Sequence, residues 1–424
     1  MILPGGVRFN WRKFIIAFVV IYTIFYVFTL PSWFKSLFQT KSEITMIMKI
    51  GHSRLVHPNI TDIKINTDSK KSKNNTNVKH TINETKPASK ESFLFVYKGQ
   101  NLYITDVLTA PGMPNLKERL KTPKMTSVKR IFSESDFREA NLGGCPDWKC
   151  EITYDHNNAN AFINAYPPAN TSFNGYVLFS TQESPVNYGA PSGSDFNMSI
   201  GFRHDSPTAS PYVASESSFP KSQPLRKTLG AVWFVSHCTT NSKRESLVSS
   251  LKKYFNVDSF GACARYQCPK LDKCENKINT EYHFYMALEN SICKDYITEK
   301  LWHQSYLNTV IPVVLKRKLV EPYVPPNSFI AFDDYKSVKE MAEHMKKLMN
   351  NKTEYIKYFD WRQKYEVIFL DGKNHDKLER PWGLCQLCRL LHLNPLSQYR
   401  IDNMDEYWKN TCEVDGQLAK EILN

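Results

Sequence analysis

The run Gly230-Ala-Val-Trp-Phe-Val-Ser236 decides the fold of the second half of the chain, because it is a continuous apolar stretch of strand length. An unbroken apolar strand is typical of a parallel sheet that helices cover on both faces. The elements predicted after it are a helix over 243–254, strands over 257–260 and 283–288, a helix over 298–307 and a strand over 310–315. This alternation predicts a Rossmann-like nucleotide-binding domain. No G-x-G-x-x-G sequence is present, which argues against a dinucleotide cofactor.

The first half of the chain also carries strand-like segments, among them 92–97 and 176–180, joined by long loops rich in Pro, Gly and Asn. Residues 220–226 have the composition of a linker between two globular domains. A length of 424 residues is consistent with two domains plus anchoring segments. The predicted organisation is a cytosolic tail 1–13, a transmembrane segment 14–34, a stem 35–90, a first domain 91–225, a second domain 226–375 and a C-terminal Cys-x-x-Cys segment and tail 376–424.

Residues 14–34 are almost purely apolar and follow Arg8, Arg12 and Lys13. As a helix, this stretch is long enough to cross a hydrocarbon core of about 30 Å. A cleaved signal peptide is the alternative, but the run is long and aromatic, and no small-x-small cleavage pattern follows it. Because basic residues precede the run, we expect a single-pass type II signal-anchor with its N-terminus in the cytosol.

Residues 35–90 are polar and basic, as in Lys-Ser-Lys-Asn-Asn-Thr-Asn at 71–77, and predict a flexible stem. Much of the formal net charge of +13 lies in this low-complexity stretch, so no nucleic-acid partner is expected. Acceptor sequences for N-glycosylation occur at Asn59, Asn74, Asn83, Asn170, Asn197 and Asn351. All of them follow the apolar run, as a lumenal body requires.

The most informative segment, 282–302, reads YHFYMALENSICKDYITEKLW. Thr298 is a predicted helix N-cap, which places Glu299 and Lys300 in the first turn. The free N–H groups at a helix start and the positive end of its dipole favour an anion such as a diphosphate. Lys300 adds a full charge there, and Glu299 can accept hydrogen bonds from ribose hydroxyls. By spacing alone, an ordinary capped surface helix fits at least as well.

This segment closely resembles the motif of the α1,3-fucosyltransferases, in which a strand ending in Glu-Asn-Ser runs into Asp-Tyr-Ile-Thr-Glu-Lys. Other segments also resemble elements of that family and occur in the same order along the chain. They are Gln-Glu-Ser-Pro at 182–185, Phe-Asn-Met-Ser-Ile-Gly-Phe-Arg-His-Asp-Ser at 196–206, and Val235-Ser236 with Asn241-Ser-Lys-Arg244. The resemblance covers about residues 92–392. The cysteine arrangement over 261–293 is similar to that of invertebrate core-type members.

The resemblance implies a GT-B architecture of two facing Rossmann-like domains, with the acceptor bound mainly by the first and GDP-fucose by the second. It implies Glu183 as the general base. The residues that it assigns to the GDP-fucose site are Arg244 and Lys300, as diphosphate ligands, and Asn290, Tyr296 and Glu299. Arg203, Asp205 and Glu289 are further candidates for the donor site or the cleft, and Glu289 is the next candidate for the base.

These residue types suit an inverting transfer of L-fucose. A sugar hydroxyl attacks the anomeric carbon opposite the leaving GDP, and a carboxylate within hydrogen-bond reach takes the proton. Fixed cations stabilise the negative charge that develops on the departing diphosphate. The expected reaction moves L-fucose from GDP-β-L-fucose to the 3-hydroxyl of GlcNAc in glycoprotein N-glycans at the Golgi membrane. The core GlcNAc is favoured, and Lewis-type transfer to peripheral LacNAc or LacdiNAc is the alternative.

The chain departs from the family pattern at Pro207, Val213, His237 and Leu288. The first two leave open the roles of the nearby charged residues at 203 and 205, but none of the four is a predicted base or diphosphate ligand. Two other classes of protein compete with an enzyme. A Golgi glycan-binding protein that has lost catalysis would not need the intact Glu183, and an adhesion ectodomain would not need the alternation of strands and helices.

The cysteines are expected to form structural disulfides in an oxidising lumen. Those assigned to disulfides are Cys145, Cys150, Cys263, Cys268, Cys274, Cys293, Cys385 and Cys388. Spacing alone also allows zinc binding or a redox Cys-x-x-Cys, and it does not determine the connectivity of the central cluster. No Asp-x-Asp metal motif lies near the donor segment, so no essential metal is expected. Mn²⁺ or Mg²⁺ could stimulate the reaction by pairing with the released GDP.

Overall fold

The computed structural model of the chain describes residues 44–50, 92–97, 100–107, 110–134, 142–169, 172–189, 195–211, 214–215, 227–265, 268, 273–363, 365–370 and 377–423. The predicted tail 1–13, transmembrane segment 14–34 and linker 220–226 lie outside these residues, as do Asn59, Asn74, Asn83, Asn170 and most of the stem. Among the helices that are described, none combines the length and the apolar character needed to cross a membrane.

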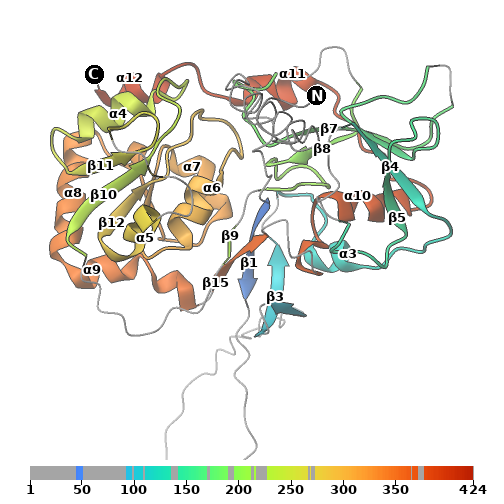
Figure 1. Ribbon diagram of the computed structural model, residues 1–424, viewed down its shortest axis with the longest axis horizontal. Coiled ribbons are helices and arrows are strands. Elements are labelled where there is room, and N and C mark those ends of the chain that lie inside the picture. Colours follow the sequence, from blue (N-terminus) through green and yellow to red (C-terminus); the bar gives the residue numbers. More distant parts are fainter. Residues whose placement is uncertain are drawn as a thin grey trace, which may run out of the picture. The chain divides into compact units, whose positions relative to one another are not determined.

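The second half of the chain forms a parallel five-stranded sheet of order β11-β10-β12-β13-β14 (Figure 1). This sheet, with the helices and loops that connect its strands, is here called the second lobe. Its strands are β10 (Leu229–Phe234), β11 (Val257–Phe260), β12 (Tyr282–Met286), β13 (Ile311–Val314) and β14 (Ile330–Ala331). The helices between and after them are α4 (Arg244–Leu251), α5 (Lys273–Thr280), α6 (Glu299–Leu301), the π-helix η2 (Trp302–Tyr306), α7 (Arg317–Val320), α8 (Val338–Asn350) and α9 (Lys352–Lys357). The prediction of an α/β fold with a parallel sheet is confirmed.

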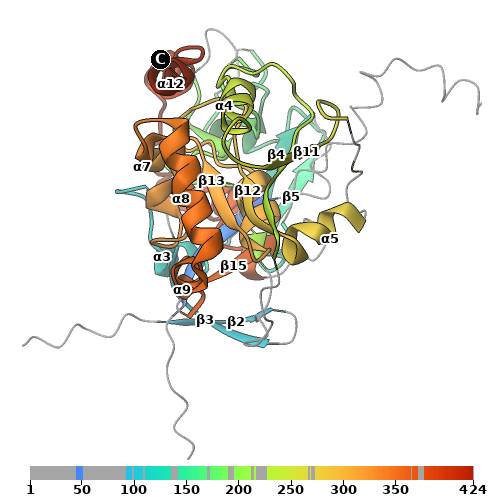
Figure 2. The ribbon, with the colours of Figure 1, turned by 90° about the vertical axis from the view of Figure 1, so that its left-hand side faces the viewer.

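Successive residues of β10 point to opposite faces of this sheet, as the pleat requires. Ala231 and Trp233 pack in one core with α4 and α8, whereas Val232 packs in another with Trp302 of η2. Figure 2 shows α8 lying across the strands on one side. Helices therefore cover both faces, which explains why the strand is apolar throughout.

The first half forms another parallel sheet, here called the first lobe, of order β5-β4-β6-β7-β8. Its strands are β4 (Lys129–Ser133), β5 (Cys150–Thr153), β6 (Ala161–Ile163), β7 (Tyr176–Thr181) and β8 (Met198–Gly201), and the short helix α3 (Leu116–Leu120) precedes them. The helix that covers one face of this sheet comes from the C-terminal segment. It is α10 (Gly383–Leu391), whose leucines pack with Ile131, Leu178 and Ile200.

A third, antiparallel sheet of order β2-β3-β1-β15-β9 was not predicted. Its strands are β1 (Ile44–Ile50), β2 (Phe93–Tyr97), β3 (Gln100–Val107), β9 (Ala214–Ser215) and β15 (Tyr365–Leu370). The prediction that all of 35–90 is a flexible stem is wrong for β1, which pairs with β3 and β15. The run Ile-Thr-Met-Ile-Met-Lys-Ile is rich in apolar and β-branched residues, which favour a strand once partner strands are available.

The C-terminal segment joins the two lobes. After α10 on the first lobe come the short helices α11 (Met404–Tyr407) and η7 (Lys409–Thr411), and the chain ends in α12 (Gln417–Leu423) beside α4 of the second lobe (Figure 1). Leu418 and Ala419 of α12 lie in the same core as Leu247 and Leu251 of α4. The remaining 3-10 turns are η3 (Glu321–Tyr323), η4 (Phe332–Asp334), η5 (Asp360–Gln363) and η6 (Lys377–Glu379).

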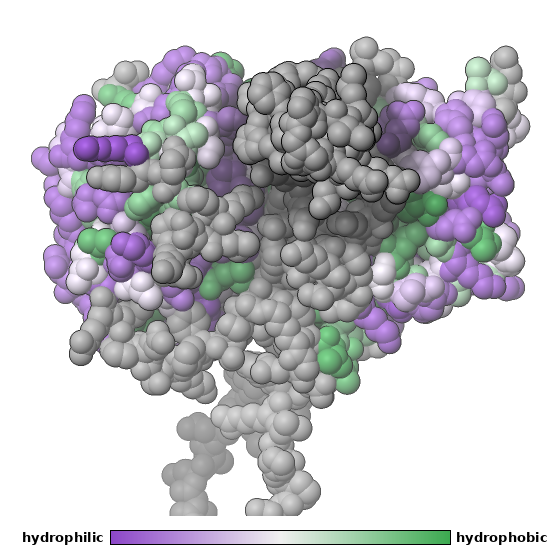
Figure 3. Space-filling model, viewed as in Figure 1, coloured by the Kyte–Doolittle hydropathy of each residue, from purple (hydrophilic) through white to green (hydrophobic). Residues whose placement is uncertain are grey.

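Hydrophilic and hydrophobic residues are interspersed on the part of the surface that is coloured in Figure 3. Two exposed hydrophobic residues, Leu94 and Val96, lie on β2, an edge strand of the antiparallel sheet. Their neighbour Phe95 is buried, so this strand has one face in the core and one in solvent.

Candidate active site

Glu183 lies in the turn directly after β7, at the carboxyl end of a first-lobe strand. Its Oε1 accepts hydrogen bonds from the backbone N–H of Ser184 at 2.8 Å, the hydroxyl of Tyr296 at 2.7 Å, and the amides of Asn187 at 3.2 Å and Asn290 at 3.3 Å. Tyr296 and Asn290 belong to the loop after β12 in the second lobe. The structure therefore brings the predicted base together with two of the predicted donor residues.

This environment keeps the Glu183 carboxylate charged. Burial by itself would raise its pKa, but the hydrogen bonds from Ser184, Tyr296, Asn187 and Asn290 outweigh that effect and lower the pKa below its ordinary value. The group is therefore ionised at neutral pH, which is the state that a proton acceptor needs.

The loop that carries Asn290 and Tyr296 is attached both to the first lobe and to the C-terminal segment. The hydroxyls of Ser291 and Ser184 lie 3.0 Å apart and are buried. A disulfide joins Cys293 to Cys412, and the N–H of Lys294 donates to the carbonyl of Thr411 at 2.9 Å. The serine contact therefore holds the loop against the first lobe, and the other two contacts hold it against the C-terminal segment.

Arg244 is the first residue of α4, and its side chain is buried. Its guanidinium donates to the carbonyl of Leu288, after β12, and to that of His237, after β10, at 3.4 Å. The order of the sheet changes direction between these two strands, and ligands of parallel α/β sheets bind at such a switch point. His237 and Leu288 depart from the family pattern, but both contact Arg244 through main-chain carbonyls.

Two buried polar atoms, Nε of Arg244 and Oδ1 of Asn290, have no hydrogen-bond partner among the residues that the structure describes. The first can only donate and the second can only accept. Buried polar atoms are nearly always paired, so an open donor on Arg244 and an open acceptor on Asn290 are consistent with a polar ligand. Burial lowers the pKa of Arg244, although Glu289 and Glu245 act in the opposite direction.

Lys300 is surrounded by groups of its own segment. Its ammonium lies 3.0 Å from Glu289 Oε2, 2.8 Å from the hydroxyl of Thr298 and 3.4 Å from Glu299 Oε1. Burial alone would lower its pKa, but two carboxylates around one ammonium raise it. Burial raises the pKa of Glu289, and the neighbouring Glu299 acts in the same direction against the pull of Lys300. In this structure Lys300 is therefore a paired cation.

The helix starts after Thr298, as predicted, with Glu299 and Lys300 in its first turn, but its capping and its length differ from the prediction. Thr298 is the N-cap of α6, but its hydroxyl and N–H both donate to Glu289 and its side chain makes no capping hydrogen bond. Helix α6 has 3 residues before the chain continues as η2. The expected long α-helix is thus wrong. Its dipole is correspondingly weak, so any anion binding here depends on the charged side chains.

Arg203 and Asp205 form a separate charged cluster. Their side chains make paired hydrogen bonds of 3.0 and 2.6 Å, Lys294 lies 2.7 Å from Asp205, and Asp295 lies 3.6 Å from Arg203. The Arg203 guanidinium also donates to the carbonyl of Tyr407 and lies over its ring. Neither Arg203 nor Asp205 contacts Glu183, so the structure gives them a role in joining the first lobe to the loop after β12.

The disulfides connect distant segments. Disulfides join Cys145 to Cys385, Cys150 to Cys388, Cys238 to Cys263 and Cys293 to Cys412, and Cys268 is disulfide-bonded as well. Two of them attach α10 to the first lobe. Cys238 and Cys412 were not assigned to disulfides from the sequence. The side chain of Cys274 lies outside the described residues.

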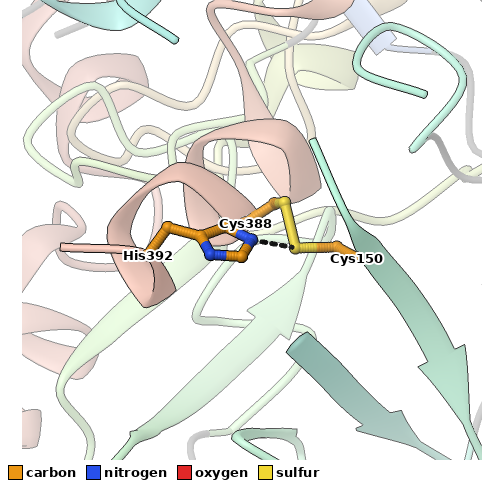
Figure 4. A group of neighbouring side chains, drawn as sticks. All are labelled: Cys150, Cys388 and His392. Atoms are coloured by element: carbon orange, nitrogen blue, oxygen red, sulfur yellow. Dashed lines mark hydrogen bonds between the residues drawn. A yellow bond between two sulfur atoms is a disulfide. The ribbon is translucent and has the colours of Figure 1, made fainter. Parts of the chain in front are cut away.

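One group of potential metal ligands occurs in the described part of the chain, formed by Cys150, Cys388 and His392 (Figure 4). The two sulfur atoms are bonded to each other, and His392 Nε2 lies 3.8 Å from Cys150 Sγ. A disulfide offers no thiolate to a metal ion, so this group is a structural crosslink.

Two predicted glycosylation sites lie in the described residues. Asn351 is exposed and is the N-cap of α9. The amide of Asn197 accepts from the N–H of Val177 at 2.7 Å and donates to the carbonyl of Tyr399 at 2.9 Å. The nitrogen that would carry a glycan is thus used within the fold, which argues against modification of Asn197.

Sequence reasoning missed Asn187, Ser184 and Ser291, which contact the base or connect the two loops. Asn187 lies four residues after Glu183, a spacing that suggests local hydrogen bonding but does not identify a partner. The sequence indicated the disulfides of Cys238 and Cys412 more clearly, because these are the two of its ten cysteines that remain when eight are assigned to disulfides.

A family model described as "Glycosyltransferase family 10 (fucosyltransferase) C-term" matches residues 224–407. The α-(1,3)-fucosyltransferase fut-1 of Caenorhabditis elegans is 46% identical over 356 residues, which cover 78% of this chain and 82% of that protein. The α-(1,3)-fucosyltransferase fut-6 of the same organism is 32% identical over 74% of this chain and 86% of its own length. A crystal structure of an α1,3-fucosyltransferase with GDP-fucose is similar with a TM-score of 0.44 and 16% identity, covering 67% of this chain and 98% of that chain. The chain belongs to the α1,3-fucosyltransferase family of glycosyltransferase family 10 and is an enzyme of that activity.

Proposed function

We propose that this enzyme transfers L-fucose from GDP-β-L-fucose to the 3-hydroxyl of a GlcNAc residue in glycoprotein N-glycans, with inversion at the anomeric carbon. The observation that carries the proposal is the position of Glu183, a first-lobe carboxylate in contact with Asn290 and Tyr296 of the second lobe. Arg244, which lies at the switch point of the second sheet, supplies a buried cation and an open donor in the same region.

In the proposed reaction the acceptor 3-hydroxyl lies beside Glu183 and attacks C1 of fucose. The new C1–O bond forms as the bond from C1 to the β-phosphate oxygen breaks, and the hydroxyl proton passes to the carboxylate. GDP leaves with the bonding electrons, and Arg244 and Lys300 stabilise its charge. Because the attacking and leaving groups occupy opposite sides of C1, the β-linked donor gives an α-linked product.

The two parallel sheets, with the candidate site formed by loops at their carboxyl ends, support a GT-B arrangement in which the first lobe binds the acceptor and the second binds the donor. Lys300 would have to exchange part of its contact with Glu289 for a phosphate oxygen.

We further propose that the chain is a type II protein of the Golgi membrane, anchored by residues 14–34, with its catalytic body lumenal. Support comes from the basic and apolar pattern at the N-terminus and from the disulfides, which persist in oxidising compartments. Removal of N-glycans from the expressed protein should lower its apparent mass. A protein that carries no glycans and faces the cytosol would contradict this part of the proposal.

The acceptor is tested by incubating the detergent-solubilised full chain with GDP-fucose and a panel of glycans, followed by mass spectrometry of the products. We expect fucose on the 3-position of the reducing-end GlcNAc of an N-glycan core. Fucose on the GlcNAc of LacNAc or LacdiNAc alone would show a Lewis-type enzyme. Transfer from another nucleotide sugar, with none from GDP-fucose, would contradict the assigned donor.

A further inference from the structure

The carboxylate of Glu183 takes all of its hydrogen bonds on one oxygen. Oε1 accepts from Ser184, Asn187, Asn290 and Tyr296, whereas no donor among the described residues reaches Oε2. A carboxylate held in this way has a fixed orientation and one open oxygen. Oε2 is therefore the atom to which the proton of the acceptor hydroxyl can pass.

Two of the four donors come from the other lobe, and the shortest of the contacts is the one from Tyr296. This residue is buried, and its ring packs edge-on against Phe202 of the first lobe with centroids 5.0 Å apart. The disulfide of Cys293 fixes the backbone three residues before it. The hydroxyl of Tyr296 is thus a preorganised donor, and hydrogen bonds from a hydroxyl to a charged oxygen are short and strong.

We propose that Tyr296, assisted by Asn290, is a positioning residue for the general base, holding Glu183 from the second lobe so that Oε2 faces the acceptor hydroxyl. This inference rests on the proposed role of Glu183. It differs from the role that the family resemblance implies, in which both residues line the nucleotide-sugar site.

The orientation of the Asn290 amide supports this assignment. An ionised carboxylate can only accept hydrogen bonds, so the amide must present Nδ2 to Glu183. Its oxygen is then the buried acceptor that has no partner in the described part of the chain. Asn290 therefore orients the carboxylate with one atom and keeps the other for a hydroxyl or N–H group of a bound sugar.

The test is a comparison of Tyr296→Phe with the unchanged full chain, measuring kcat, the KM for GDP-fucose and the pH dependence of kcat/KM. The variant keeps the ring and its packing against Phe202 and removes only the hydroxyl. We expect kcat to fall by about 10- to 100-fold, because a base that is no longer aligned transfers the proton less often. The KM for GDP-fucose should stay within about twofold of the unchanged enzyme's value. The acid limb of the kcat/KM pH profile should move to higher pH, because the carboxylate has lost a hydrogen bond that favours its charged form.

Tyr282→Phe is the matched control. Tyr282 donates to Asp258 at 2.8 Å, so this variant also removes a tyrosine–carboxylate hydrogen bond from the second lobe, at the start of β12 rather than after its end. It should leave kcat and the acid limb unchanged. Asn290→Asp is a second variant, which places another negative charge beside Glu183 and should also move the acid limb to higher pH.

A double-variant cycle separates this inference from the proposed function. In a Glu183→Gln background, Tyr296→Phe should cause less than about twofold further loss, because residues that act through one another are not additive. A raised KM for GDP-fucose with unchanged kcat and acid limb in Tyr296→Phe would overturn the inference and show a donor ligand. If Glu183→Gln itself kept most of its turnover, the proposed base would be wrong, whatever Tyr296→Phe did.

Discussion

The hydroxyl oxygens of Ser184 and Ser291 lie 3.0 Å apart, and both side chains are buried. Each serine is directly next to a site residue, Glu183 in one lobe and Asn290 in the other. A neutral hydrogen bond therefore joins the loop that carries the base to the loop that carries the donor residues, beside the hydrogen bonds of Tyr296 and Asn290 to Glu183.

We predict that Ser291→Ala lowers both stability and turnover. The substitution leaves the Ser184 hydroxyl buried without this partner, which costs about 1–3 kcal/mol in free energy of unfolding. Urea unfolding measures that loss, and Ser246→Ala, on the exposed side of α4, is the control that should change neither quantity. A Ser291→Ala protein as stable and as active as the unchanged enzyme would show that the two loops are held by other contacts.

The disulfide between Cys293 and Cys412 should matter for catalysis as well as for stability. Replacing both cysteines by serine should cost about 2–5 kcal/mol and should slow turnover of the folded protein, because the loop bearing Tyr296 loses its attachment to the C-terminal segment. The control is the same replacement at Cys145 and Cys385, which attach α10 on the first lobe. It should lower the melting temperature while leaving kcat of the folded protein unchanged. Equal effects of the two pairs on kcat would contradict a specific role for the loop.

Lys300→Ala is expected to weaken GDP binding by about 10- to 100-fold, because a charge-assisted contact with the diphosphate is lost. The variant should also be less stable, since Glu289 is buried and loses its cation. The double variant Lys300→Ala/Glu289→Gln removes the uncompensated charge and should recover stability without recovering GDP affinity. Unchanged GDP affinity in calorimetry would show that Lys300 serves only the ion pair with Glu289.

The charged cluster around Asp205 predicts a pH-dependent contribution to stability. Burial alone would raise the pKa of Asp205, but Arg203 and Lys294 outweigh it and lower the pKa. A carboxyl group with a lowered pKa in the folded state stabilises the protein above its unfolded pKa of about 3.9, and the stabilisation is lost as the pH falls through the folded value. Asp205→Asn should therefore be less stable at pH 7 by about 1.5–3 kcal/mol. That difference should shrink as denaturant unfolding is repeated toward pH 3, and a difference that grows on acidification would contradict the ion pair.

The strands of the second lobe could be predicted because each one is a short apolar run that can be recognised in its own segment of the sequence. The strand over 257–260 was predicted at its observed bounds, and β10, β12 and β13 were located within one or two residues. The α-helix expected over 298–307 is not observed, because the chain adopts the wider turns of a π-helix over 302–306, where the Ser305 hydroxyl donates to the carbonyl of Lys300. No pattern in the sequence indicates that this hydrogen bond forms.

The candidate site could not be predicted in the same way, because it is formed by contacts between residues that are far apart in the sequence. Glu183 and Tyr296 are 113 positions apart, and each is unremarkable in its own segment, so only the family resemblance could connect them. The cysteine pairings likewise join residues 240 and 238 positions apart. Strand β1 was missed because a short apolar run inside a polar stretch gains its stability from partners elsewhere in the chain.

The central claim, that Glu183 accepts the proton of the acceptor hydroxyl, is tested most directly by the kinetics of Glu183→Gln. The amide keeps the size of the side chain and removes its ability to take up a proton. We predict a fall in kcat of about 10²–10⁴-fold, with GDP affinity and melting temperature close to those of the unchanged enzyme. A folded Glu183→Gln protein that keeps most of its turnover would contradict the claim and would make Glu289 the next carboxylate to examine.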